Sequence, residues 1–152
     1  MAELEELSEN MEEYLETIYR LTLKKGIAKT GEIAKHLKLS PPSVTEMNQR
    51  LEQMGYIVYK PYQGVTLTEK GERHAYHLLR RHRVVQEFLM QVLGMEKVDA
   101  HEWACKMEHV VPLELERYLY SKLPTRDLKG LAPPKTLEEA GMVANERGGS
   151  GE

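Results

Sequence analysis

The strongest constraint on the fold is a turn, Leu-Ser-Pro-Pro at residues 39–42, between two segments of helical periodicity. Apolar residues recur there every three or four positions, which is typical of amphipathic helices. They are Ile33, Ala34 and Leu37 before the turn, and Val44, Met47, Leu51 and Met54 after it. Because proline suits the first turn of a helix, the second helix can begin inside this turn.

Further elements flank this helix pair. A helix is expected over residues 10–24, with Asn10 as its N-cap, and two short strands over residues 56–59 and 65–68. Helix, helix, tight turn, helix and hairpin is the order of a winged helix-turn-helix. Beyond it the sequence predicts helices over residues 68–93, from Asp99 to the interruption at Pro112, and over residues 113–123.

The charge distribution singles out the same segment. The 152-residue chain has 21 Lys and Arg against 24 Asp and Glu, but residues 20–64 carry eight basic and three acidic residues, a net charge of +5. A locally basic segment in an acidic protein favours a polyanionic partner for that segment. Double-stranded DNA is the expected partner, and a winged helix that contacts protein is the alternative.

The candidate DNA-binding residues fall into three groups. The start of the second helix of the pair would enter the major groove, the hairpin turn would lie along the backbone or minor groove, and nearby basic residues would contact phosphates. The first group is Ser40, Pro42, Ser43, Thr45, Glu46, Asn48 and Gln49, all expected to be exposed; the second is Lys60 and Tyr62; the third is Lys29, Lys35 and Arg50.

A second pattern lies on the helix after Asp99. At about 100° per residue, His101, Cys105, Glu108 and His109 fall within an arc of about 100°, apart from the apolar stripe. Imidazole, thiolate and carboxylate at i, i+3 and i+4 spacing predict a metal site. Carboxylates and imidazoles favour Mn²⁺ or Fe²⁺, and a thiolate shifts the preference toward Fe²⁺, Co²⁺, Ni²⁺ or Zn²⁺. His82 and the pair Glu13 and Glu16 are possible partners that the residues alone do not select; the alternative is an ordinary solvated face.

Five stretches carry a resemblance to a known family. They are Met-Glu-Glu-Tyr-Leu-Glu-Thr-Ile-Tyr at 11–19, Ser-Pro-Pro-Ser-Val-Thr at 40–45, Leu-Thr-Glu-Lys-Gly at 67–71, Arg-His-Arg at 81–83 and Cys-Lys-Met-Glu-His at 105–109. Over residues 8–123 the chain resembles the metal-dependent repressors of the diphtheria toxin repressor family, which includes the manganese transport regulators. The resemblance implies a winged-helix domain followed by a helical dimerisation domain, with metal binding that favours a DNA-binding homodimer.

The resemblance also implies site residues. Glu13, Cys105, Glu108 and His109 correspond to one metal site, and His82 and His101 to a second, with Glu16 a possible shared ligand. The chain combines features of two branches: a carboxylate at position 13 is typical of the manganese branch, and Cys105 of the iron branch. Gln86 stands where the iron branch usually has an acid, which weakens the expected second site.

The sequence therefore predicts a mainly α protein with a winged helix-turn-helix domain over 1–72, an all-helical metal-binding and dimerisation domain over 73–144, and a flexible tail over 145–152. The expected function is a cytoplasmic, homodimeric repressor of metal homeostasis genes, activated by Fe²⁺ or Mn²⁺, with Co²⁺, Ni²⁺ or Zn²⁺ able to bind in vitro. The acidic N-terminus is unlike a secretory signal, and no apolar run would span a membrane. The rivals are a winged-helix regulator that responds to an organic ligand and, less favoured, a metalloenzyme; no enzymatic motif is apparent.

Overall fold

The computed structural model describes residues 7–128, which form two compact units that meet between Tyr76 and His77. The expected domain boundary after residue 72 lies four residues earlier, inside the same helix. The expected tail, and the end of the expected dimerisation domain, lie outside the described residues. No helix within 7–128 is long and apolar enough to cross a membrane.

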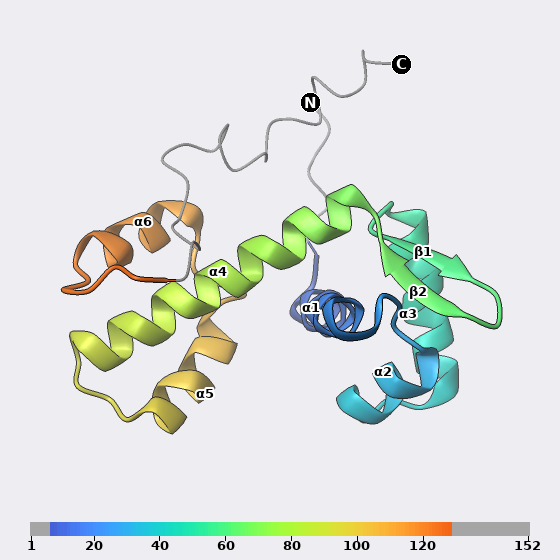
Figure 1. Ribbon diagram of the computed structural model, residues 1–152, viewed down its shortest axis with the longest axis horizontal. Coiled ribbons are helices and arrows are strands. Elements are labelled where there is room, and N and C mark those ends of the chain that lie inside the picture. The colour runs from blue at the N-terminus through green and yellow to red at the C-terminus, as the bar shows by residue number, and fades with distance from the viewer. Residues whose placement is uncertain (1–6, 129–152) are drawn as a thin grey trace, which may run out of the picture. The chain divides into compact units, whose positions relative to one another are not determined.

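The N-terminal unit has the predicted order of elements (Figure 1). Helices α1 (Glu9–Lys25), α2 (Thr30–Leu37) and α3 (Pro41–Gln53) are followed by strands β1 (Ile57–Lys60) and β2 (Gly64–Leu67) and by the first turns of α4 (Glu69–Gln91). Its core is built from the apolar stripes of the three helices and the inner face of the hairpin. The side chains with no measurable exposure include Tyr14, Leu15, Ile18, Ile33, Leu51 and Val65. The winged helix-turn-helix prediction is confirmed.

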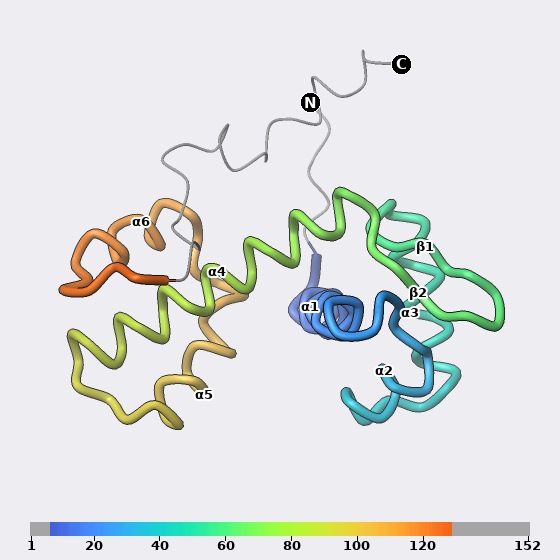
Figure 2. Tube along the Cα trace, in the orientation of Figure 1, coloured from blue at the N-terminus to red at the C-terminus, as the bar shows by residue number. Residues whose placement is uncertain are grey.

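Strands β1 and β2 and the turn between them form an antiparallel hairpin, here called the wing (Figure 2). In its register Ile57 lies opposite Leu67, and Lys60 opposite Gly64. Ala28 pairs with Val65 by two backbone hydrogen bonds of 2.8 and 2.9 Å, which fix the wing to the segment before α2. Gly64 permits this approach: its φ is +136°, and a Cβ there would lie 2.4 Å from the Ala28 carbonyl oxygen.

The C-terminal unit contains the rest of α4, together with α5 (Lys97–Met107) and α6 (Leu113–Ser121). One buried cluster joins α4 and α5, and a second joins α4 to the segment after α6. The first contains Val85, Leu89, Ala100, Ala104 and Val111, and the second Val84, Leu123 and Leu128. The described part of this unit is helical, as predicted.

Two predicted helix starts are wrong. Helix α1 begins at Glu9, and its N-cap is Ser8, whose hydroxyl accepts a 3.2 Å hydrogen bond from the Met11 amide. Asn10 therefore lies in the first turn and not at the cap. Helix α5 begins at Lys97, so Asp99 also lies in a first turn, where its charge suits the helix dipole.

Candidate metal centre and nucleic-acid interface

Imidazole, thiol and carboxylate side chains meet between α4 and α5 of the C-terminal unit. His82 Nε2 lies 3.2 Å from His101 Nδ1, and Cys105 Sγ lies 3.6 Å from His101 Nε2. One ligand atom from each of these three residues lies within 4.8 Å of the other two. Helix α4 supplies His82 from a buried position, while His101 and Cys105, one turn apart on α5, are more accessible.

Glu108 and His109 extend this cluster at the end of α5. Glu108 Oε2 is 3.1 Å from His82 Nδ1, and Glu108 Oε1 is 3.4 Å from His109 Nε2. The side chains of all three residues are at most 5% exposed. The Glu108 carboxylate is within hydrogen-bond distance of Nδ1 of the His82 ring, and the other ring nitrogen, Nε2, faces His101. A carboxylate that orients an imidazole in this way is typical of metal sites.

The grouping differs from the one the resemblance implied. The resemblance places Cys105 with Glu13, Glu108 and His109, whereas in the structure its Sγ lies 3.6 Å from Nε2 of His101, a residue of the expected second site. Within this unit the residues of both expected sites form one connected group. Nitrogen, oxygen and sulfur donors around a buried carboxylate fit a divalent transition metal, so the donor chemistry agrees with the predicted group.

Gln86 is a member of this group that the candidate ligand set lacked. Its Oε1 lies 3.0 Å from His82 Nε2 and 3.4 Å from His101 Nδ1. The signal was present in the sequence, because Gln86 follows His82 by four residues and so shares its helix face. A neutral amide oxygen is a weaker metal ligand than the acid that the resemblance places at this position.

The two candidate carboxylates of α1 have different surroundings. Glu13 is exposed, whereas Glu16 is buried and accepts a 2.6 Å hydrogen bond from Arg20 Nη2. Both belong to the N-terminal unit, and their part in metal binding stays a prediction.

The candidate DNA-binding surface belongs to the N-terminal unit. Ser40 caps α3, and its hydroxyl accepts a 3.3 Å hydrogen bond from the Ser43 amide. The side-chain hydroxyl of Thr45 bonds back to the Pro41 carbonyl at 3.1 Å. Eleven of the twelve candidate residues are exposed, as a nucleic-acid surface requires. They are Lys29, Lys35, Ser40, Pro42, Ser43, Thr45, Glu46, Gln49, Arg50, Lys60 and Tyr62.

Asn48 is the exception, and its predicted exposure is wrong. Its side chain is buried and accepts a short hydrogen bond from the Tyr14 hydroxyl of α1. Burial raises the pKa of Tyr14 far above its usual value, so this hydroxyl stays protonated and remains a donor. Asn48 therefore joins the recognition helix α3 to α1.

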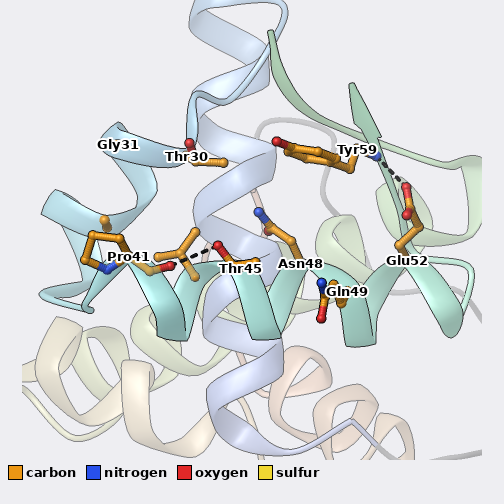
Figure 3. Close-up of a pocket in the computed structure, with 10 residues that line it drawn as sticks. Thr30, Gly31, Pro41, Thr45, Asn48, Gln49, Glu52 and Tyr59 are labelled. Atoms are coloured by element: carbon orange, nitrogen blue, oxygen red, sulfur yellow. Dashed lines mark hydrogen bonds between the residues drawn. The ribbon is translucent and has the colours of Figure 1, made fainter. Parts of the chain in front are cut away.

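A pocket of about 400 Å³ opens between α2, α3 and β1 (Figure 3). Thr45, Gln49 and Glu52 line it from α3, and Tyr59 faces them from β1. Glu52 is held by a 2.7 Å hydrogen bond from the Tyr59 amide. The concave surface beside α3 thus continues to the wing, whose tip residue Tyr62 is fully exposed in a left-handed conformation (φ +64°).

Comparison with known proteins explains why both arrangements occur in one chain. Residues 6–65 match the family model "Iron dependent repressor, N-terminal DNA binding domain", and residues 68–130 match "Iron dependent repressor, metal binding and dimerisation domain". The chain belongs to the iron-dependent repressor family. Its winged helix is the DNA-binding domain of that family, and the His, Cys and Glu cluster lies in the metal-binding and dimerisation domain.

Relatives of this repressor are transcriptional regulators. It is 42% identical to an uncharacterized HTH-type transcriptional regulator of Methanocaldococcus jannaschii, over 72% of this chain and 88% of the relative. It is 39% identical to the HTH-type transcriptional regulator MntR of Lysinibacillus sphaericus, over 66% of this chain and 71% of that one. Family membership supports a metal-dependent transcriptional repressor over a regulator that responds to an organic ligand.

A solved structure gives the same result for the fold. The manganese regulator SloR superposes with a TM-score of 0.65 at 31% identity, over 76% of this repressor and 54% of SloR. The repressor thus spans about half the length of SloR.

Proposed function

We propose that this repressor binds an operator in double-stranded DNA as a homodimer when Fe²⁺ or Mn²⁺ is bound, and that it controls metal homeostasis genes in the cytoplasm. One observation carries the proposal: a connected His, Cys and Glu cluster occurs in the same chain as a winged helix-turn-helix with an exposed polar recognition surface.

The residues that would hold the ion are His82, His101, Cys105, Glu108 and His109. An imidazole must be neutral to bind a metal, and the thiol of Cys105 would lose its proton on binding one. The bound ion supplies positive charge and a fixed coordination geometry. We further propose Glu13 and Glu16 as ligands contributed by α1, following the family resemblance.

Cys105 is the proposed determinant of metal preference. A thiolate is a soft ligand that favours Fe²⁺, Co²⁺, Ni²⁺ or Zn²⁺. Carboxylates and imidazoles, by contrast, suit Mn²⁺ as well as Fe²⁺. Substitution Cys105→Glu should therefore shift the preference toward Mn²⁺. Competition between Mn²⁺ and Co²⁺, measured by the absorbance of bound Co²⁺, tests this; an unchanged ratio of affinities would contradict it.

The proposed DNA contacts follow from exposure and chemistry. Ser40, Ser43, Thr45 and Gln49 offer short hydrogen-bonding groups at the start of α3, where a recognition helix meets base edges or phosphates. Exposed lysine and arginine residues around α2 and the wing would contact phosphates. Because Asn48 is bonded to Tyr14, we assign it no base contact.

The proposed dimer contact uses the apolar residues that the C-terminal unit leaves exposed. Trp103 on α5 is 54% exposed and Tyr118 on α6 is 65% exposed, so both offer apolar area to a partner. A second copy of the chain is the proposed occupant, since this region matches a dimerisation domain. Sedimentation of a Trp103→Glu variant tests the assignment: a stable dimer would contradict it.

The test of the metal-activated function uses DNA binding at saturating metal. We expect His109→Ala and Glu13→Ala to keep the fold but lose metal-stimulated operator binding. Glu102→Ala, at an exposed position on α5 outside the cluster, is the matched control and should behave like the wild type. Operator binding equal to wild type in the first two variants would reject their role.

A further inference from the structure

A buried cluster of charged side chains joins α4 to α6. Glu116 has no exposed side-chain surface and accepts hydrogen bonds from Arg80 Nε at 2.7 Å and Arg80 Nη2 at 3.1 Å. Arg81 Nε adds a third bond to Glu116 at 3.2 Å. Because Arg80 already pairs with both carboxylate oxygens, Arg81 is not needed to neutralise Glu116.

Arg81 makes a second contact, to the end of α5. Its Nη1 donates a 3.1 Å hydrogen bond to the Glu108 backbone carbonyl. In a continuing helix, that carbonyl would accept from the amide four residues later, but this residue is Pro112, which has no N–H. The sequence thus removes the helical donor, and Arg81 of α4 replaces it.

The position of this carbonyl matters because it belongs to the peptide group between Glu108 and His109. Both residues belong to the proposed metal centre, and their backbone follows the last regular turn of α5. An anchored peptide between two ligands limits the directions in which their side chains can point, and such outer contacts commonly raise metal affinity.

We propose that Arg81, held by Glu116, is a positioning residue for Glu108 and His109, and that it links α6 to the metal centre. The inference rests on the proposed function, because it assumes that these two residues bind a metal. It assigns Arg81 a role that differs from that of Arg80: Arg80 stabilises the fold by pairing with Glu116, whereas Arg81 sets the geometry of the two ligands.

Two substitutions of Arg81 separate positioning from fold stability. Arg81→Lys keeps the positive charge, but its single nitrogen cannot hold both Glu116 and the carbonyl in the fork geometry of arginine. Arg81→Met keeps the aliphatic stem and removes both bonds. Arg117→Lys, at an exposed position beside Glu116, is the matched control.

The readouts are the affinity for Co²⁺ and Mn²⁺ by titration calorimetry, the absorption spectrum of bound Co²⁺, and the thermal midpoint of the metal-free protein. We expect Arg81→Lys to remain folded without metal, to bind both ions about tenfold more weakly and to alter the Co²⁺ spectrum. Arg81→Met should weaken binding further. Arg117→Lys should match wild type in all three.

The outcomes are distinguishable. If Arg81→Lys has the metal affinity and the Co²⁺ spectrum of the wild type, the inference is overturned. If Arg81→Met does not fold, the result for Arg81→Lys is sufficient for the test. If the wild type itself binds neither Co²⁺ nor Mn²⁺, the proposed function fails instead.

Discussion

The hydrogen bond between Tyr14 and Asn48 gives the sharpest prediction for stability. Tyr14 is completely buried on α1, and its hydroxyl donates to Asn48 Oδ1 on α3, with the Val44 carbonyl 3.4 Å away. Substitution Tyr14→Phe removes one oxygen atom and leaves the ring in place. The Asn48 oxygen, itself buried, then loses its donor.

The magnitude follows from the cost of that orphaned group. A buried polar group that loses its partner costs about 1–3 kcal/mol, and no cavity larger than an oxygen atom adds to it. We therefore expect Tyr14→Phe to lower the free energy of unfolding by about 1–3 kcal/mol, a large part of the 5–15 kcal/mol typical of a folded protein. Recognition by α3 should also suffer, because Asn48 fixes this helix to α1.

Urea denaturation of the metal-free protein, followed by circular dichroism, measures this loss. Tyr62→Phe, the same change at the exposed tip of the wing, is the control and should stay within about 0.5 kcal/mol of wild type. In the double variant Tyr14→Phe/Asn48→Ala the loss should be smaller than the sum of the two single losses. A loss below about 0.5 kcal/mol for Tyr14→Phe would refute the reasoning.

Three further predictions concern the same unit. The pKa of Tyr14 is raised in the folded protein, so its hydroxyl keeps its proton above pH 10, whereas the unfolded chain loses it. The free energy of unfolding should therefore fall as the pH rises above about 10. Tyr14→Phe should reduce that fall in urea denaturation at alkaline pH. A Cβ at Gly71 would lie 2.0 Å from the Tyr56 carbonyl oxygen, so Gly71→Ala should lower the free energy of unfolding by about 1–3 kcal/mol in the same denaturation assay. Gly31→Ala is the control: a Cβ there has no atom within 4 Å, so it should not lower that free energy. Lys60→Ala should weaken DNA binding on all sequences and lower the slope of log affinity against log salt by about 1; an unchanged slope would remove Lys60 from the interface.

The winged helix could be predicted because its signals are local. The apolar stripes, the Pro-Pro turn and the two short strands joined by a turn are each recognisable within a few residues of sequence. Asn48 was misassigned although Val44, Asn48 and Leu51 follow i, i+4 and i+7 spacing, which places the asparagine on the buried stripe. A polar side chain alone favours exposure, whereas the tyrosine that bonds to this one lies 34 residues away in the sequence.

The metal centre could be predicted in part. The helical face of α5 identifies His101, Cys105, Glu108 and His109 as one group. Helical spacing leaves His82 only a possible partner, because it says nothing of how α4 packs against that face. Arg81 belongs to the Arg-His-Arg stretch at 81–83, but no local pattern indicates its contacts with Glu116 and the Glu108 carbonyl. Glu116 had a local signal, because a carboxylate three residues after Leu113 falls on the buried stripe of α6 and requires a cationic partner.

The central claim is that metal occupancy controls DNA binding, and fluorescence anisotropy tests it most directly. The purified protein is stripped of metal by chelation, mixed with labelled duplexes from its own promoter region, and titrated with Mn²⁺ and, anaerobically, with Fe²⁺. We expect binding that appears only with metal. The ion that acts at the lower concentration shows whether the carboxylate or the thiolate ligands dominate the metal preference. Equal operator affinity with and without metal would contradict the account.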